Sequence, residues 1–396
     1  MTIAYLTDVE GRWDKLVSFA TANPHVALVD GALQLAPGVT FVFGGDAVDR
    51  GPAGRRIVDV LLAAKRAYGE RVVLLAGNRD INKLRLAREL TGEPPPTAPA
   101  EVRASPPALL RWIFATTMGA PKAFGHRATE LAAAGRPADD DAVVASYLAD
   151  LAPGGPQRAY LHACQLGYRA GATLIVHGGV TAENLGVVPD LPRQPTVAAW
   201  LAALAQFYAA ELAAFEAGAS PERLLAYQRP KAGTHLNQAS VVYARPTDEL
   251  GNPHLPAADV IAQLAAEGIR RLVVGHTPSG DCPAILRAGD FELVLADNSY
   301  SRLELGSHVA FTDDETSVHA TAELADGTRR AVRTTSGRAD HASPLGRRLR
   351  ATGQLVKAQL DTGDLLLFRG LAEHRVEQVA GSTADVLKCD LEAAVE

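Results

Sequence analysis

Six short apolar runs recur along the chain, and each ends in glycine, asparagine, aspartate or histidine. Continuous runs of this length, rich in Val, Ile and Leu, are typical of strands that are buried on both faces. We therefore expect each run to form a strand. The runs lie at residues 3–8, 40–46, 71–78, 173–179, 270–276 and 292–298.

Two segments between these runs have the spacing of helices. Apolar residues recur with helical period in residues 53–69, after a Gly-Pro start, and residues 257–268 end on a glycine that suits a helix C-terminus. Alternation of buried strands with helices predicts a layered α/β fold.

Two longer inserts interrupt this alternation. Residues 91–170 open with a proline-rich loop and continue as several helices, and residues 194–227 carry a long amphipathic helix. One interpretation is that both inserts add packing to the core. The other is that they form a helical cap that shapes access of the substrate.

The C-terminal part has a different pattern. β-rich runs flank Asp326-Gly327, which predicts a hairpin, and residues 364–379 predict one or two further strands. We therefore divide the chain into a domain at residues 1–310, which contains both inserts, and a β-rich extension at residues 311–396.

Composition limits the classes of partner. The chain has 396 residues and a formal net charge of −6, so it offers no general attraction for nucleic acid or an anionic membrane. Its apolar runs are shorter than the roughly 20 residues of a membrane-spanning helix, and its N-terminus lacks the features of a signal peptide. The three cysteines lie far apart without CxxC spacing. We therefore expect a cytoplasmic protein with no membrane or nucleic-acid partner.

Polar residues that suit a metal ion follow the apolar runs. In open α/β sheets, ligands bind where strands finish, so these residues are considered together. Carboxylates, an amide and imidazoles suit divalent ions such as Mn, Fe, Zn or Mg. The set comprises Asp8, Glu10, Asp46, Asp49, Asn78, His177 and His276.

The order of these residues carries the prediction, because each alone is weak evidence. An aspartate after a strand is commonly a helix cap or turn former, and a lone histidine is commonly structural. Neighbouring glycines, among them Gly44, Gly45, Gly77 and Gly275, let an ion or phosphate approach the main chain.

Five sequence blocks carry a resemblance to a known family. They are Asp8-Val9-Glu10-Gly11, GGDAVDRG at 44–51, GNRD at 77–80, HGG at 177–179 and GHTP at 275–278. In this order they resemble the calcineurin-like metallophosphoesterase superfamily, and most closely its phosphoprotein-phosphatase and diadenosine-tetraphosphatase branch. The resemblance implies an α/β fold, a layered β-sandwich flanked by helices, with helical insertions and a β-rich C-terminal extension.

The resemblance also implies a two-metal centre. A hydroxide shared by the two ions would attack phosphorus in line. Asp46 would bridge the ions. The first ion would be held by Asp8, Glu10 and Asp46, and the second by Asp46, Asn78, His177 and His276.

Four further residues complete the catalytic site that the resemblance implies, namely Asp49, Arg50, Arg79 and Asp80. Arg50 and Arg79 would bind the substrate. The planar donor fork of Arg50 suits phosphoryl oxygens. The structural alternative for Arg50 is a salt bridge to Asp49.

Glu10 stands where the family usually has histidine. Three carboxylates, at Asp8, Glu10 and Asp46, together with a bridging hydroxide balance the charge of two divalent ions. Because a carboxylate is a harder donor than imidazole, we expect a manganese pair, with Mg, Zn or Fe as alternatives. If Glu10 points away, the first ion would bind weakly.

Arg79 replaces the histidine of the GNHE or GNHD block, to which the family assigns protonation of the leaving oxygen. Arginine does not donate a proton at neutral pH, because its pKa exceeds about 12. It would instead clamp developing charge on an oxygen, with Asp80 fixing its orientation. GNRD is also similar to the motif of the UDP-diacylglucosamine pyrophosphohydrolases, which cleave a phosphoanhydride.

This replacement predicts a preference among leaving groups. Without a general acid at this position, cleavage should favour groups that need little protonation, such as phosphates, nucleotides or aryl oxygens. Alternative acids, for which surface or structural roles are the other interpretation, are His126, His162, His235 and His254.

We therefore predict a metal-dependent hydrolase that cleaves a phosphate ester or phosphoanhydride of a small molecule or nucleotide. Protein serine/threonine phosphatase activity is an alternative, because GGDAVDRG is typical of that branch. A non-catalytic binding protein that keeps the fold is another alternative. The sequence leaves the oligomeric state open.

Overall fold

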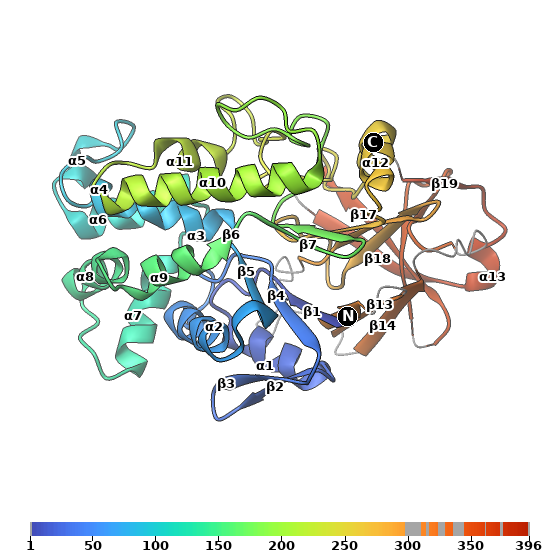
Figure 1. Cartoon of the computed structure of the whole chain (residues 1–396). Coiled ribbons are helices and arrows are strands. Elements are labelled where there is room, and N and C mark those ends of the chain that lie inside the picture. Colours follow the sequence, from blue (N-terminus) through green and yellow to red (C-terminus); the bar gives the residue numbers. More distant parts are fainter. Residues whose placement is uncertain are drawn as a thin grey trace.

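The computed structural model has stacked sheets at its centre, helices along one side and a further sheet at the opposite end (Figure 1). The structure describes residues 2–297, 310–313, 317–323, 329–335, 344–360, 362–372 and 375–394.

The first sheet has the strand order β14-β13-β12-β1-β4-β5-β6. β1, β4, β5 and β6 are parallel, and β12 pairs antiparallel with the other edge of β1. The strands are β1 (Thr2–Leu6), β4 (Val39–Phe43), β5 (Val72–Leu75), β6 (Cys164–Gln165), β12 (Ala310–Asp313), β13 (Ser317–Glu323) and β14 (Arg329–Thr335).

The second sheet has the strand order β10-β11-β9-β8-β7. β8, β9 and β11 are parallel, and β7 and β10 are its antiparallel edges. The strands are β7 (Gly167–Ala170), β8 (Thr173–Val176), β9 (Arg271–Val274), β10 (Ala284–Ala288) and β11 (Phe291–Leu295). Each of the six expected strands is therefore confirmed, as β1, β4, β5, β8, β9 and β11.

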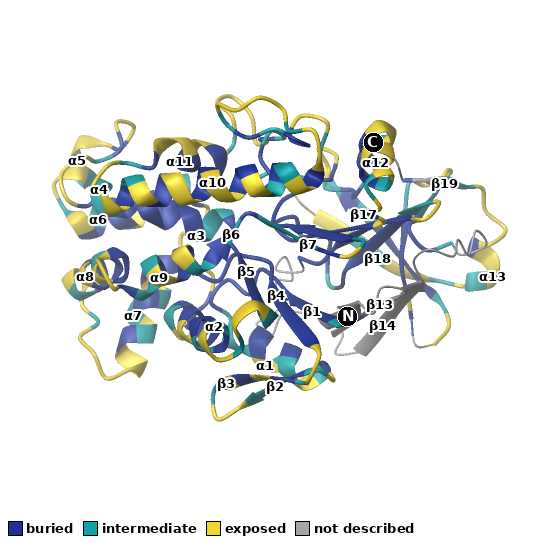
Figure 2. Cartoon of the chain, viewed as in Figure 1, coloured by how far each residue is buried: buried dark blue, intermediate teal, exposed yellow. Residues whose placement is uncertain are grey.

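The central strands are covered on both faces, which explains their continuous apolar runs. Successive side chains of a strand point to opposite faces. In β1, Ile3 and Tyr5 pack in the core between the two sheets, whereas Ala4 and Leu6 pack in the core that includes the helices. Figure 2 shows the strands as the buried centre and the exposed residues on the outer faces of the helices. The predicted layered β-sandwich flanked by helices is confirmed.

Both expected helices of the core form. The first is α2 (Gly54–Tyr68), which ends at Gly69 in a left-handed conformation with φ 56°, and the second is α12 (Ala258–Ala266). The apolar pattern did not predict α1 (Trp13–Ala22) or the hairpin of β2 (Val26–Val29) and β3 (Ala32–Leu35).

The first insert is helical, as expected, but its strands belong to the core. Its last residues, expected to be part of the insert up to residue 170, instead form β6 and β7, which are edges of the two sheets. The elements between β5 and β6 are α3 (Asn78–Asn82), η2 (Lys83–Arg85), α4 (Leu86–Glu89), α5 (Ala100–Arg103), α6 (Pro106–Trp112), a π-helical turn (Ile113–Thr117), α7 (Ala123–Ala133), α8 (Asp140–Leu151) and α9 (Pro156–Ala163).

The second insert contains α10 (Val197–Glu216) and α11 (Glu222–Tyr227). By length and composition alone, α10 could cross a membrane, with a mean hydropathy of 1.4. In the structure its apolar side packs on protein: Trp200 is fully buried and donates its indole N–H to the Val187 carbonyl at 3.0 Å. Its buried Glu211 accepts a hydrogen bond from Arg223 Nε at 2.7 Å. These contacts identify α10 as a packed helix of the insert.

The C-terminal residues form a further sheet with the order β18-β17-β16-β15-β19 and its own small core. The strands expected at residues 364–379 are confirmed as β17 and β18. The expected boundary at residue 310 separates strands of one sheet, because β12–β14 extend the first sheet beside β1. The predicted turn at Asp326-Gly327 lies outside the described residues, although β13 and β14 pair as a hairpin requires. The elements are β15 (Arg347–Leu349), β16 (Leu355–Gln359), β17 (Leu365–Leu371), β18 (Arg375–Gly381), α13 (Thr383–Val386) and β19 (Leu391–Ala393).

Candidate active site

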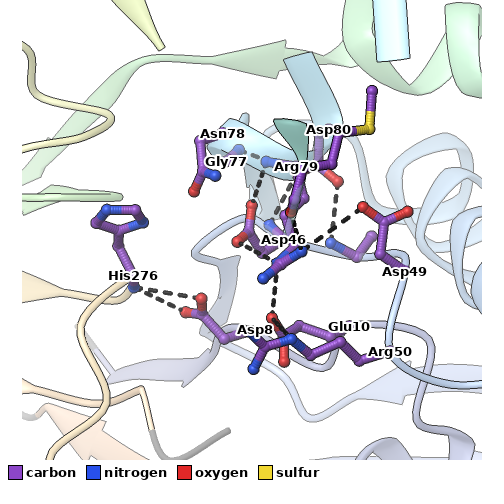
Figure 3. Close-up of polar contacts among 12 residues, drawn as sticks. Asp8, Glu10, Asp46, Asp49, Arg50, Gly77, Asn78, Arg79, Asp80 and His276 are labelled. Atoms are coloured by element: carbon purple, nitrogen blue, oxygen red, sulfur yellow. Dashed lines mark hydrogen bonds and ion pairs between the residues drawn. The ribbon is translucent and has the colours of Figure 1, made fainter. Parts of the chain in front are cut away.

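The predicted site residues meet where parallel strands of the two sheets end. Asp8 follows β1, Asp46 follows β4, Asn78 follows β5, His177 follows β8 and His276 follows β9. Figure 3 shows Asp8, Asp46, Asn78 and His276 facing a common centre. The carboxyl ends of parallel strands thus assemble groups that are far apart in the sequence, as expected for an α/β fold.

Asp46, His177 and His276 form a set of metal donors. Each offers a ligand atom, and these atoms lie within 4.8 Å of one another. His177 Nδ1 is 2.8 Å from the Gly44 carbonyl oxygen, so Nδ1 donates to this oxygen and Nε2 is the ring nitrogen that faces the other donors. Nε2 lies 3.3 Å from Asn78 Oδ1 and 3.5 Å from Asp46 Oδ1. The amide of Asn78 therefore adds a fourth donor.

His276 is also suited to bind a metal. Its Nε2 atom is buried and, among the described residues, has no hydrogen-bond partner. Burial, the nearby Arg245 guanidinium and His177 lower the pKa of His276 well below its usual value. The imidazole is therefore neutral at physiological pH, which is the form that binds metal ions. These donors fit a divalent ion.

Asp8 lies beside this set with a high density of negative charge around it. Its carboxylate accepts hydrogen bonds from the Thr7 hydroxyl at 2.5 Å and from the backbone N–H of His276 at 3.1 Å. Burial, Asp297 and Asp46 raise the pKa of Asp8 well above its usual value. Asp297, which lies two residues after the end of β11, was not predicted as a site residue. Clustered carboxylates of this kind favour a bound cation.

Glu10 and Arg79 form an ion pair in the centre of the site (Figure 3). Arg79 Nε lies 2.7 Å from Glu10 Oε1 and 3.6 Å from Asp46 Oδ2. Although burial opposes the charge, the carboxylates of Glu10, Asp46 and Asp49 raise the pKa of Arg79 above its usual value. The guanidinium is therefore charged at every working pH.

Asp80 does not orient Arg79, contrary to the expectation from the sequence. Its carboxylate is fully buried and accepts backbone N–H groups from Asp46 at 2.8 Å and from Ala47 and Gly77 at 2.9 Å. Burial and the Asp46 carboxylate raise the pKa of Asp80 to about 7. Asp80 thus fixes the backbone turns after β4 and β5, and with them the position of Asp46.

Arg50 pairs with Glu10 and not with Asp49. Arg50 Nε lies 3.4 Å from Glu10 Oε1, and its side chain is 41% exposed, so its donors remain accessible. Asp49 instead accepts from the buried Lys83 Nζ at 2.7 Å, while its Oδ1 is buried and has no partner among the described residues. Lys83 was not predicted, because a lysine in a helical segment is commonly a solvated one.

Backbone strain is concentrated at this site. Of the seven described non-glycine residues with positive φ, five are Asp8, Glu10, Asp46, Asp49 and His276. Such conformations cost roughly 1–3 kcal/mol each and persist where surrounding structure imposes them. Gly77 is required for close approach, since a Cβ there would lie 2.1 Å from Asp46 Oδ1.

Two residues on the segment before α12 were missed by the sequence analysis. The ring of Tyr243 lies 4.8 Å from that of His276, and Arg245 is close enough to lower the pKa of His276. The segment has no apolar run of its own that would mark a strand end. An arginine within two residues of an aromatic side chain is the signal available in the sequence, and it is weak.

The histidines considered as alternative acids differ in their surroundings. His162 pairs with Glu216 at 2.7 Å and is exposed, His235 is exposed, and His254 contacts the Leu255 carbonyl at 3.0 Å. His126 lines a small cavity that Asp49 also lines. Burial, Lys122 and Arg12 lower the pKa of His126.

Comparison with known proteins agrees with this geometry. A sequence model of the calcineurin-like phosphoesterase family matches residues 1–209, which include the first four of the five blocks. No curated protein matches the chain. A solved cold-active protein-tyrosine phosphatase of a psychrophile, Shewanella sp., is 19% identical, with a TM-score of 0.48, and the match covers 83% of this chain and 80% of that chain.

A solved protein serine/threonine phosphatase from Saccharomyces cerevisiae is 13% identical, with a TM-score of 0.34, and the match covers 86% of this chain and 81% of that chain. Neither structure is similar enough to indicate a substrate. The family match covers more than half of the chain, and the site holds the donor types that the family uses. The chain therefore belongs to the calcineurin-like phosphoesterase family and is a metal-dependent phosphoric-ester hydrolase.

Proposed function

We propose that the protein hydrolyses a phosphate ester or phosphoanhydride of a small molecule or nucleotide, using a divalent ion held by Asp46, Asn78, His177 and His276. The observation that carries this proposal is the convergence of carboxylate and imidazole donors within 4.8 Å of one another at the strand ends. Among the finer expectations, manganese is the proposed ion, with Mg, Zn or Fe as alternatives.

A bound divalent ion would lower the pKa of water and neutralise phosphoryl oxygens. The chain supplies the remaining functions. The hydrogen bond from His177 Nδ1 to Gly44 holds the other ring nitrogen toward Asp46. Arg50 has an exposed side chain at the rim and can bind incoming phosphoryl oxygens through its donor fork. Arg79 contributes fixed positive charge beside Asp46.

The leaving group should require little protonation. Arg79 occupies the position of the expected proton donor and remains charged, so it stabilises negative charge without giving a proton. The lowered pKa of His126 makes its imidazole neutral and hence a poor acid at neutral pH. These features favour phosphoanhydrides and aryl phosphates over alkyl phosphates. The similarity of GNRD to the pyrophosphohydrolase motif favours the same preference.

Protein serine/threonine phosphatase activity is the second candidate. GGDAVDRG at residues 44–51 favours it, since that block resembles the phosphoprotein-phosphatase branch. Arg79 argues against it, because serine and threonine are alkyl leaving groups that benefit from a general acid. We further propose a cytoplasmic protein that binds neither membrane nor nucleic acid, on the grounds of its charge and cysteine pattern.

The proposal is tested with metal-stripped protein that is resupplied separately with Mn, Mg, Zn or Fe. Phosphate monoesters, diesters, pyrophosphates and a phosphoserine peptide are offered under each condition. We expect metal-dependent release of phosphate, fastest from anhydrides or aryl esters. His276→Ala should remove the activity. An absence of metal-dependent cleavage of every substrate by folded protein would contradict the proposal.

The leaving-group argument has its own test in Arg79→His. A restored acid is typically worth 10² to 10⁴ in rate. The variant should therefore improve the ratio of alkyl to aryl phosphate cleavage. An unchanged ratio would refute the assignment of substrate preference to Arg79, whatever the effect on absolute rate.

A further inference from the structure

The two positions at which this chain departs from the family pattern are in direct contact. Glu10 and Arg79 both stand where the family has histidine, and their side chains meet with Nε 2.7 Å from Oε1. The side chains are 4% and 11% exposed. A carboxylate and a guanidinium therefore replace two imidazoles at positions that are adjacent in space. The replacements are therefore electrically complementary.

The guanidinium of Arg79 is held on several sides. Besides Glu10, it lies 3.6 Å from Asp46 Oδ2, and its Nη1 lies 3.8 Å from Asp49 Oδ2. Nη1 also donates to the Met118 carbonyl at 3.3 Å, which comes from the first helical insert. Figure 3 shows the guanidinium between Asp46, Glu10 and Asp49. Because the guanidinium contacts three carboxylates and a backbone carbonyl, it is a fixed part of the site.

We infer that the Arg79 guanidinium takes the place of the first of the two ions expected from the sequence, so that each chain holds a single divalent ion on the side of His177 and His276. The inference rests on the metal dependence stated in the proposed function and specifies its stoichiometry. Glu10 is then the partner of a built-in cation and not a metal ligand. Two ions would require Glu10 to bind the first ion while its Oε1 atom is held by Arg79.

The site carries more carboxylates than cations. Among the described residues, six buried carboxylates surround the centre, and the nearby cations are two buried lysines, Arg79, Arg245 and the more exposed Arg50. The carboxylates therefore outnumber the cations, so the site favours a bound cation even with Arg79 in place. The carboxylates are Asp8, Glu10, Asp46, Asp49, Asp80 and Asp297, and the lysines are Lys15 and Lys83.

A further divalent ion between Glu10 and Asp46 would face strong repulsion. It would have to approach two carboxylates that already lie 2.7 Å and 3.6 Å from Arg79 Nε. In a buried site, like charges at such separations are poorly screened. On the side of Asn78, His177 and His276, by contrast, His276 Nε2 is buried and unpartnered among the described residues.

The inference is tested by metal stoichiometry, which does not depend on activity. Full-length protein is equilibrated with excess Mn, freed of unbound metal and analysed by inductively coupled plasma mass spectrometry. We expect about one Mn per chain and a mononuclear electron paramagnetic resonance spectrum. Two Mn per chain would overturn the inference and leave the proposed function standing. If the same measurement repeated with Mg, Zn and Fe also finds no bound metal, both the inference and the proposed function are overturned.

Variants identify the cause of the stoichiometry. The double change Glu10→His and Arg79→His restores the family residues and should raise the content to two ions with a magnetically coupled spectrum. Arg79→Met frees Glu10 without adding a ligand and serves if the double variant does not fold; it should also gain an ion. Folded variants that still bind one ion would overturn the role of Arg79.

The chain offers a matched control at Arg85. Its Nε lies 2.7 Å from Glu89 Oε1, the same distance as in the Arg79 pair, and both side chains are largely buried at 19% and 16% exposed. Arg85→Met therefore also breaks a shielded arginine–glutamate pair, on the segment next to the site. It should bind one ion as the native protein does. A gain of an ion in this variant would overturn the specific assignment to Arg79.

Discussion

Asp150 connects the helical insert to the core, and its removal gives a quantitative test of the packing. Its carboxylate, 4% exposed on α8, accepts from Arg127 Nη1 of α7 at 2.8 Å and from Arg55 Nη1 of α2 at 2.7 Å. Arg127 is itself 8% exposed. Asp150→Ala would leave this buried guanidinium without its main partner.

The expected loss follows from the burial of each partner. Removing one member of a buried pair costs about 3–5 kcal/mol, because the other charge stays desolvated. Arg127 retains Glu130 at 3.8 Å and the Tyr147 ring at 4.4 Å, and Arg55 is partly exposed, so we expect the lower end, about 3 kcal/mol. The assay is urea unfolding followed by tryptophan fluorescence.

Two comparisons make this prediction refutable. Asp140, also on α8, is an exposed bidentate partner of Arg111 on α6, and Asp140→Ala should destabilise the protein much less than Asp150→Ala. The double change Asp150→Leu and Arg127→Met removes both charges and should be much less destabilising than Asp150→Ala. If Asp150→Ala is no more destabilising than Asp140→Ala, the Asp150–Arg127 pair does not stabilise the packing of the insert.

Three further predictions follow from close packing and burial elsewhere. Gly77→Ala would place a Cβ 2.1 Å from Asp46 Oδ1 and should abolish metal binding measured by mass spectrometry. At Gly125 a Cβ would meet nothing within 4 Å beyond the backbone of its own helix, so Gly125→Ala should not affect metal binding. Trp200→Ala should lower the free energy of unfolding in urea by about 3–5 kcal/mol, since the indole is fully buried; a loss below 1 kcal/mol would contradict its role in the core. Burial lowers the pKa of Lys357, so the unfolded chain binds more protons than the folded chain at alkaline pH. The free energy of unfolding of the native protein relative to Lys357→Met should therefore rise as the pH increases toward about 10, and equal pH slopes in urea titrations would refute this.

The sequence predicted the parts of the fold whose pattern is local. Strands buried on both faces leave continuous apolar runs, so β4 and β5 were identifiable with the polar residues that follow them. Pairing partners leave no such trace. The pairing of β1 with β12 joins residues from opposite parts of the chain, and the short edge strand β6 looks like the end of a helical insert.

The candidate site shows the same division. Donor types and their order were predicted because they follow strands, and Asp46, His177 and His276 do converge. The partner of each charged side chain was not predictable. Arg79 turns to Glu10 and Asp46 while Asp80 binds backbone N–H groups, although Asp80 is its immediate neighbour in the sequence. Side-chain direction at a tight turn depends on the fold around it.

The position of β1 has a consequence for synthesis on the ribosome. β1 lies between β4 and β12, so one of its edges stays open until residues 310–313 have been made. An open edge strand can pair with other chains. A nascent or truncated chain that stops before residue 310 should therefore be prone to aggregate, and the first strand to emerge is among the last to be fully paired.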